Sequence, residues 1–275
     1  MASLPKFFSI SAASTYKQCP RKWKHRYIDK LPDPPGEAAL VGTFAHHVLE
    51  VLCEKEPEER TTDEAKKIAR EVWPETASNK DFQSLNLSES EEKEFRWKAW
   101  TAIDGLWKLE DPTEIDVLST EKRISVNLDE VPFYGIVDRL DQSSAGTIVT
   151  DYKTGKPPKP AYRDKALDQI ILYAAAVESE TGELPAKGRL LYLGKESSEI
   201  EVDINQELIS NSTGQFTETW NDLARDCAED SFDTGTGPLC GWCPYAGICE
   251  DGQKEVRKRL EAGRMRADAP ALMLI

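Results

Sequence analysis

A block of three strand-like segments between residues 122 and 153 constrains the fold of this chain most strongly. Apolar and polar residues alternate over 122–128, 133–141 and 146–153, and short segments containing Asp, Gly, Ser or Pro separate them. Period-two alternation between turn-forming residues is typical of consecutive β-strands. The block therefore predicts three consecutive strands joined by short turns.

The segments that follow add helices and further strands to this block. A helix is predicted from about 166 to 179, two strand-like segments at 188–194 and 199–204, and a second helix over 205–226. The order β-β-β-α-β-β predicts an α/β or α+β core in which helices flank a mixed sheet. With 275 residues, of which 39% are hydrophobic, the chain can bury such a core, which excludes disorder as its main description.

Helical segments precede the strands. Residues 41–54 carry an apolar stripe at helical spacing, whereas 54–94 contains 13 acidic and seven basic residues. Tryptophans recur through and beyond this acidic region at Trp73, Trp97, Trp100 and Trp107. We interpret 55–110 as a helical insert with a packed core and a solvated acidic face.

The charge distribution limits how this chain can bind nucleic acid. A net charge of −14 argues against coating DNA through bulk positive charge, but it leaves room for a local basic groove. Residues 17–30 contain six Lys or Arg against one Asp (+5), and 254–266 contain six against two Glu (+4). If the chain ends are neighbours, these stretches predict a basic groove in which Trp23, Tyr27 and Trp242 stack bases. The alternative is that each stretch is a solvated helix face.

The apolar segments are too short to span a bilayer. Residues 170–177 form about the longest of them, well below the roughly 18–20 residues that a membrane helix requires. The first residues lack the charged segment, apolar core and cleavage site of a secretory signal. We therefore expect a cytoplasmic protein, in which six cysteines are metal ligands or core residues rather than disulfides.

Two acidic strand ends form the first candidate site. Asp151 and Lys153 are two apart at the end of one predicted strand and so share a face, and Asp138 lies on the preceding strand. Paired carboxylates hold a hard divalent cation such as Mg²⁺ or Mn²⁺, and a neighbouring Lys can stabilise charge that develops on a phosphate. The alternative is that these are turn residues and a surface ion pair, because D-x-K is a common tripeptide.

The wider sequence resembles the RecB-like branch of the PD-(D/E)XK nucleases. Four motifs of that branch occur in order: G-T-F-A-H-H-V-L-E at 42–50, F-Y-G-I-V-D-R at 133–139, I-V-T-D-Y-K-T-G at 148–155 and Q-I-I-L-Y at 169–173. The resemblance implies a restriction-endonuclease-like core in a single domain. It also implies a metal-dependent exonuclease that hydrolyses phosphodiester bonds of DNA, preferably single strands or ends.

The resemblance also implies residue roles. His46, Asp138 and Asp151 would bind Mg²⁺ or Mn²⁺ together with the backbone carbonyl of Tyr152, and Lys153 would be the catalytic lysine. Histidine at 46 matches the motif's metal-binding position, and its neighbour at 47 falls in a variable one.

Three further residues would position the site or the DNA. Gln169 and Tyr173 are four apart, so they share one face of the predicted helix. Arg139 would either reach a phosphate or pair with an acid, and the sequence leaves these alternatives open.

The cysteines form the second candidate site. Cys240, Cys243 and Cys249 have the spacing C-x2-C-x5-C, and three thiolates need a fourth ligand to complete a zinc or iron–sulfur site. The candidates for this ligand are Cys19, Cys53 and Cys227. The last two lie where core packing is expected, whereas Cys19 precedes a proline as Cys243 does. Spacing alone does not separate zinc from iron and sulfur.

This layout resembles that of RecB-like nucleases with a [4Fe–4S] cluster, such as the AddB nuclease domain and the CRISPR-associated exonucleases with their phage-encoded relatives. It implies that Cys19, Cys240, Cys243 and Cys249 bind a cluster that joins the terminal segments 9–30 and 227–266. A homo-oligomer and partner proteins of recombination or CRISPR spacer acquisition are further implications. The alternatives are a non-catalytic protein that binds DNA ends as an adaptor, and a nuclease subunit that a partner activates.

Overall fold

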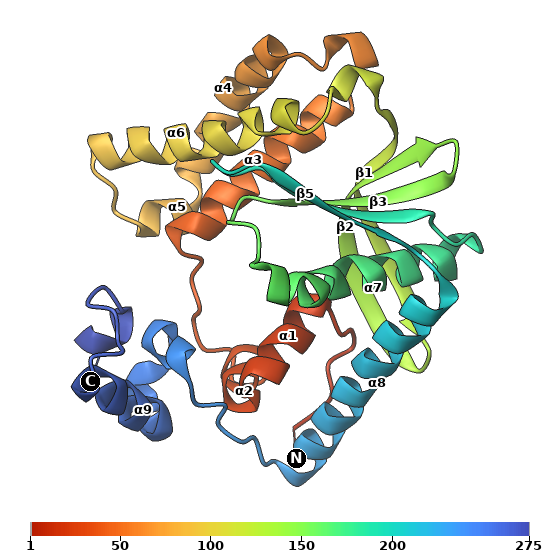
Figure 1. Cartoon of the computed structure of the whole chain (residues 1–275). Helices are drawn as coiled ribbons and strands as arrows, with labels where there is room; N and C mark the ends of the chain where they lie inside the picture. Colours follow the sequence, from red (N-terminus) through yellow and green to blue (C-terminus); the bar gives the residue numbers. More distant parts are fainter. Residues whose placement is uncertain (1, 275) are drawn as a thin grey trace. The chain divides into compact units, whose positions relative to one another are not determined.

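The predicted strands form one five-stranded mixed sheet (Figure 1). The computed structural model describes residues 2–274. The strands occur in the sheet in chain order: β1 (Asp116–Leu128), β2 (Val131–Ser143), β3 (Gly146–Lys153), β4 (Lys187–Tyr192) and β5 (Ser198–Asp203). β3 pairs antiparallel with β2 and parallel with β4, and β4 pairs antiparallel with β5. The mixed sheet is therefore confirmed, although β1 begins at Asp116 rather than at residue 122.

The parallel pairing of β3 with β4 requires a crossover, which α7 (Arg163–Thr181) supplies. Its apolar run 170–177 is buried, and Ile170 packs against β4, where a Cβ on Gly188 would lie 2.9 Å from the isoleucine side chain. The helix ends at Gly182, whose φ of 79° is the left-handed conformation that favours glycine. The crossover helix thus matches the helix predicted from the sequence.

The helical insert packs on α3 (Glu37–Cys53) and on the sheet. It contains α4 (Thr62–Ser78), α5 (Lys80–Ser84) and α6 (Glu89–Asp104). A capping box of Ser88 and Glu91 begins α6, whose buried face continues the core of α3. Tyr152 and Leu191, neighbours on β3 and β4, belong to the same apolar cluster. The insert therefore covers one face of these strands.

The tryptophans of the insert do not all belong to its core. Trp73, Trp100 and Trp107 pack against the cluster, as the sequence predicts, whereas Trp97 is 63% exposed. Trp97 lies two residues from both Phe95 and Ala99, which are buried on α6. Two residues correspond to about 200° around a helix, so Trp97 lies on the opposite face.

The described chain groups into two compact units. The sheet unit comprises residues 34–129 and 133–214, and the terminal unit comprises the segments up to Asp33, 130–132 and from Gln215 onward. The helices of the terminal unit are α1 (Ile10–Gln18), α2 (Pro20–Tyr27), the second part of α8 (Gln206–Glu229) and α9 (Glu250–Glu261). The terminal segments form a unit because they pack around their own aromatic core.

That core corrects one prediction for DNA binding. Trp23 is 1% exposed and stacks between Tyr27, at 5.3 Å between ring centroids, and Phe232, at 6.2 Å. It therefore cannot stack on a base. Trp242 is 41% exposed and has the guanidinium of Arg266 5.9 Å from its ring.

The remaining helical elements are short 3₁₀ turns. They are η1 (Pro57–Glu59), η2 (Leu106–Lys108), η3 (Pro112–Glu114), η4 (Pro160–Tyr162), η5 (Pro238–Trp242), η6 (Ala246–Ile248) and η7 (Pro270–Met273). Over residues 2–274, no helix combines the length and the apolar character needed to cross a membrane.

Candidate active site

The ends of β2 and β3 bring the two predicted aspartates together. The last pair of facing residues on these two strands is Arg139 and Thr150. Asp138 and Asp151 are the next residue on each strand, so they occupy the following pair of facing positions. Oδ2 of Asp138 accepts a hydrogen bond of 2.7 Å from the backbone N–H of Tyr152. Asp151 itself is only 3% exposed. Strand pairing thus holds two carboxylates where the sequence predicts a metal site.

α3 and β1 contribute two further groups to this point. Nδ1 of His46 lies 3.4 Å from Oδ1 of Asp138, and the ligand atoms of His46, Glu121 and Asp138 all lie within 4.8 Å of one another. Glu121 has a φ of 43°, in the left-handed region that non-glycine residues seldom adopt. Such strained residues often occur at functional sites. The sequence analysis missed Glu121, because the run Glu-Lys-Arg in which it stands has the composition of a solvated strand end.

The grouped charges shift the pKa values of these residues. Burial alone would lower the pKa of His46, but the hydrogen bond and charge of Asp138 outweigh it and raise that pKa. Burial and the charge of Asp138 raise the pKa of Glu121. The same two causes raise the pKa of Asp151 to about 6. The carboxylates thus disfavour one another's charged form, a repulsion that a bound cation would relieve.

Lys153 and Gln169 form a hydrogen-bonded chain beside Asp151. Nζ of Lys153 lies 2.6 Å from Oδ2 of Asp151 and donates to Oε1 of Gln169 at 2.8 Å. Nε2 of Gln169 donates to Oδ1 of Asp151 at 3.0 Å and to the hydroxyl of Tyr173 at 3.3 Å. Gln169 and Tyr173 lie on adjacent turns of α7, as their spacing predicts. The lysine ammonium is therefore held in place by groups from two elements.

A glycine of the second motif makes room for this chain of contacts. A Cβ on Gly135 would lie 2.7 Å from Cε1 of Tyr173 and 2.8 Å from Cζ of Phe133. Real Cβ atoms do not approach carbon atoms so closely, so either ring would have to move. The tyrosine reaches Gln169 only because position 135 has no side chain.

The donor set at this point fits a hard divalent cation. Carboxylate oxygens from Glu121 and Asp138 and an imidazole nitrogen from His46 suit ions such as Mg²⁺ and Mn²⁺. Asp151 adds a buried carboxylate, whose charge helps to raise the pKa of His46. All of these residues belong to the sheet unit.

The sequence model of the PD-(D/E)XK nuclease superfamily matches residues 7–250. The chain belongs to this superfamily. The name of the superfamily describes Pro-Asp followed, farther on, by Asp or Glu, any residue and Lys; in this chain Val137 stands in place of the proline. Asp138 with Asp151-Tyr152-Lys153 otherwise has that form.

Two relatives of this PD-(D/E)XK protein cover most of its length. The Gene 69 protein of Mycobacterium phage L5 is 23% identical over 281 residues, covering 88% of this chain and 95% of the relative. The crystal structure of a candidate exonuclease from Eubacterium rectale superposes with a TM-score of 0.55 at 12% identity, over 90% of this chain and 88% of that one. At this identity the structural likeness shows the shared fold.

Arg139, next to Asp138 in this PD-(D/E)XK site, points away from it. Its side chain is fully buried, and its guanidinium lies 2.6 Å from Glu110 and 2.7 Å from Asp141. It also donates to the hydroxyl of Tyr152 at 2.8 Å. Of the two alternatives that the sequence leaves open, the structure shows the pairing with acids, and burial keeps the guanidinium from a DNA phosphate. Sequence reasoning did not identify Glu110, which precedes η3 and carries no motif.

The second histidine of the pair has a different environment. The side chain of His47 is 43% exposed, and its Nδ1 lies 2.9 Å from Glu50 on the next turn of α3. Only one of the two adjacent imidazoles, that of His46, therefore reaches the carboxylates.

Four cysteines of the terminal unit line one cavity: Cys19, Cys240, Cys243 and Cys249. Backbone N–H groups point at three of the sulfurs. Sγ of Cys19 accepts from Lys22 and Gly235 at 3.4 and 3.3 Å, Cys240 from Gly237 at 3.4 Å and Cys249 from Gly252 at 3.3 Å. Hydrogen bonds of this kind favour a thiolate, but burial outweighs them at Cys240 and Cys243 and raises the pKa of both thiols. The other two cysteines, Cys53 and Cys227, are buried elsewhere, as the sequence predicts.

Proposed function

We propose that this protein is a divalent-metal-dependent DNA exonuclease that prefers single strands or DNA ends. One observation carries the proposal: the ligand atoms of His46, Glu121 and Asp138 lie within 4.8 Å of one another. Beside them lies Asp151, which is paired with Lys153 at 2.6 Å. A protein that only binds DNA needs a positive surface for the phosphates. A group of carboxylates repels a phosphate unless a bound cation lies between them, so this group favours a metal-dependent enzyme over a DNA-binding protein.

The chain's own residues have separate tasks in this proposal. His46, Glu121, Asp138 and Asp151 would hold the cation, with the Tyr152 carbonyl as a further predicted ligand. A bound divalent cation lowers the pKa of water and neutralises charge on the scissile phosphate. The Lys153 ammonium offers a fixed positive charge for the oxyanion that develops at the phosphate. Gln169 positions that ammonium through its 2.8 Å hydrogen bond, and Tyr173 in turn contacts Gln169.

We further propose that the terminal unit binds a [4Fe–4S] cluster. Supporting this are the shared cavity of Cys19, Cys240, Cys243 and Cys249 and the N–H groups directed at their sulfurs. Sulfurs around a zinc ion lie about 3.8 Å apart, as Zn–S bonds of about 2.3 Å dictate. Over the described residues no three cysteine sulfurs lie within 4.8 Å of one another, so the choice of iron and sulfur over zinc rests on the resemblance of the cysteine layout and is decided by metal analysis.

The cluster's role would be structural. Cys19 caps the N-terminus of α2, and Cys249 caps that of α9, so a shared cluster would tie both helices together. Metal binding by four thiolates that are far apart in sequence stabilises the folded state directly. Anaerobically purified protein should contain iron rather than zinc and absorb broadly near about 400 nm. If the purified protein is colourless and contains zinc but no iron, the proposal of a [4Fe–4S] cluster is wrong.

The basic stretches of the terminal unit are partly neutralised. Lys24 pairs with Asp29 at 2.7 Å and Arg259 with Glu255. Among the basic residues left without an ion pair in residues 2–274 are Lys17, Lys22, Lys30, Arg257, Lys258 and Arg264. We propose that these residues guide the DNA backbone, while the acidic remainder of the chain repels it. The biological setting, whether recombination, replication or CRISPR spacer acquisition, remains a prediction, as do partner proteins and a homo-oligomer.

The decisive experiment uses single-stranded DNA labelled at the 5′ or the 3′ end. Wild type, Lys153→Ala and Asp151→Ala would be compared with Mg²⁺ or Mn²⁺ and with chelator. We expect metal-dependent degradation by wild type alone, and the label released first gives the polarity. If cluster-replete wild type binds the DNA but leaves it intact, the proposal is wrong and the protein is an adaptor or a subunit that a partner activates.

A further inference from the structure

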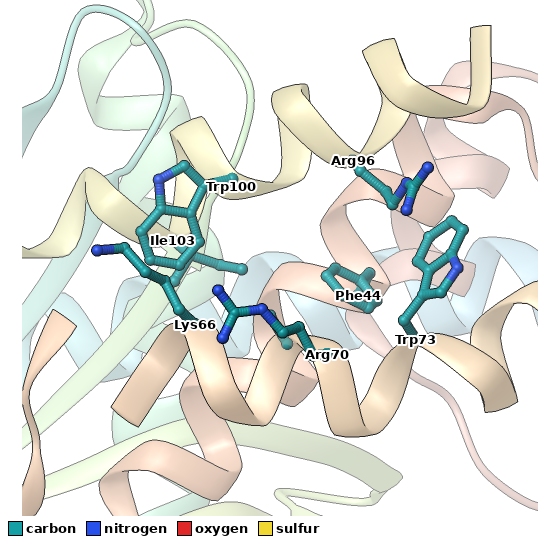
Figure 2. Close-up of a pocket in the computed structure, with 8 residues that line it drawn as sticks. Phe44, Lys66, Arg70, Trp73, Arg96, Trp100 and Ile103 are labelled. Carbon is teal, nitrogen blue, oxygen red and sulfur yellow. The ribbon is translucent and has the colours of Figure 1, made fainter. Parts of the chain in front are cut away.

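The helical insert contains a cavity that the proposed active site does not use. It lies among α3, α4 and α6 and has a volume of about 340 Å³, within the range of small-molecule sites (Figure 2). Phe44 of α3 lines it, whereas His46, two residues later, reaches the carboxylates. Two residues are about 200° around a helix, so cavity and active site lie on opposite sides of α3.

Two tryptophans give the cavity aromatic walls. Figure 2 shows Trp73 and Trp100 on either side, with the Arg70 side chain between them. Both indole rings are half-buried, and each is approached by a cation: Arg96 lies 5.0 Å from the Trp73 centroid and Lys66 5.8 Å from that of Trp100. Planar aromatic walls suit a flat, uncharged or electron-rich ring.

The cavity is basic, although the surrounding insert is acidic. Lys66, Arg70 and Arg96 line it, and no carboxylate does. Lys66 and Arg96 share their charge with acids of their own helices, Asp63 at 3.0 Å and Glu92 at 3.5 Å. Arg70 is exposed, and within residues 2–274 its side chain forms no hydrogen bond or ion pair. In a chain of net charge −14, an unpaired guanidinium between aromatic walls is an anion site.

We propose that this cavity binds a nucleotide, with its base against the indole rings and its phosphate on Arg70. A flat ring joined to an anion is the chemistry that this combination fits, and the fixed fork of a guanidinium matches the oxygens of a phosphate. The nucleotide is either a free mononucleotide or one unit of a single strand. The cavity is separate from the candidate metal site of His46, Glu121 and Asp138, so nucleotide binding there does not depend on nuclease activity.

The test is a titration followed by tryptophan fluorescence, with full-length protein in chelator so that no strand is cleaved. The ligands are dTMP, a ten-residue oligo(dT) and inorganic phosphate. Arg70→Gln removes the free charge, and Lys67→Gln is the matched control, because Lys67 lies on the same helix, is exposed and does not line the cavity. Neither residue packs in the core, so both variants should fold.

We expect Lys67→Gln to bind like wild type and Arg70→Gln to bind about tenfold more weakly, as the loss of one charged hydrogen bond dictates. Arg70-dependent binding of dTMP identifies a site for free nucleotides. If Arg70→Gln weakens the binding of the oligonucleotide but not that of dTMP, the cavity binds a nucleotide unit of a single strand. Equal dissociation constants for Arg70→Gln and Lys67→Gln with both nucleotides would overturn the proposal.

A second pair of variants tests the base. Trp100→Phe keeps an aromatic wall, whereas Trp100→Leu removes it, and stacking of one base predicts about fivefold or greater weakening in the leucine variant only. Phosphate that binds as tightly as dTMP, or a leucine variant that binds like the phenylalanine variant, would show that the cavity does not recognise a base.

Discussion

The two faces of β3 contact two different groups of charged side chains. Asp151 and Lys153 face a group that contains three carboxylates against one ammonium and one imidazole. On the other face, Tyr152 and Thr150 contact a group in which two arginines, Arg139 and Arg189, pair with Glu110 and Asp141. Arg189 also pairs with Glu199 and Glu201 at the edge of this group. Adjacent residues of one strand thus serve a site in which carboxylates repel one another and a buried network in which each arginine pairs with at least two acids.

The difference separates function from stability. A network of buried ion pairs tolerates burial because each charge has a partner of opposite sign, and loss of one partner leaves an unpaired charge in the core. A group with excess negative charge is unfavourable by itself and becomes favourable when a cation completes it. We therefore expect variants of the first group to change activity and metal binding, and variants of the second to change stability.

The largest effect should follow Glu110→Gln. Glu110 is 5% exposed and contacts both arginines, so its loss should lower the free energy of unfolding by about 3–5 kcal/mol. Chemical denaturation measures this. Glu199→Gln is the control: Glu199 is 31% exposed and pairs with Arg189 alone, and it should lose no more than about 1 kcal/mol. Equal losses in the two variants would contradict the distinction.

This network should also respond to acid. Burial would raise the pKa of Glu110, but the charges of Arg139 and Arg189 outweigh it and lower that pKa. A lowered pKa means that the carboxylate stabilises the fold above its unfolded pKa, about 4.3, and that this stabilisation is lost as the pH falls through the folded value. Between pH 7 and pH 4, wild type should therefore keep its advantage over Glu110→Gln, and the two should converge only at lower pH.

The adjacent histidines provide the next test. His46→Ala should reduce DNA degradation by about 10²-fold or more, because it removes a candidate metal ligand. His47→Ala should have a much smaller effect, because its imidazole pairs with Glu50 and influences Glu121 through its charge alone. Initial rates on end-labelled single strands measure both. Similar losses of activity in the two variants would contradict the prediction that His46 alone of this pair is a metal ligand.

A smaller effect should follow the addition of metal. At about 100 times its dissociation constant, Mg²⁺ or Mn²⁺ should stabilise wild type by about 2.7 kcal/mol, seen as a rise in Tm. Asp138→Asn should remove this rise, while Glu199→Gln should retain it. A rise that survives in Asp138→Asn would place the ion elsewhere.

The smallest effect concerns charge repulsion without metal. Asp151→Asn removes one of three neighbouring carboxylates, so in chelator we expect its stability to equal or exceed that of wild type by up to about 1 kcal/mol. Thermal unfolding in chelator measures this. A loss comparable to that of Glu110→Gln would mean that both faces of β3 serve stability.

Much of the fold follows from local sequence patterns. The strands of the sheet and α7 appear where period-two alternation and the apolar run at 170–177 predict them, because each pattern matches the burial of its own element. The sequence groups the terminal segments 9–30 and 227–266 only through the resemblance, since their packing depends on aromatic contacts such as that of Trp23 with Phe232.

Within the site, the sequence by itself determined the residue types and their order: His46, Asp138, Asp151, Lys153, Gln169 and Tyr173 stand in motifs whose spacing follows strand and helix periods. Only the tertiary structure decided that Glu121 joins them and that Arg139 turns to Glu110 and Asp141. Outside the site, it also decided that the Arg70 side chain has no ion-pair partner within residues 2–274. The physical reason is that a periodic pattern reports which face of its own element a side chain occupies. The partner of a charge comes from another element, and only the packing of the elements brings the two together.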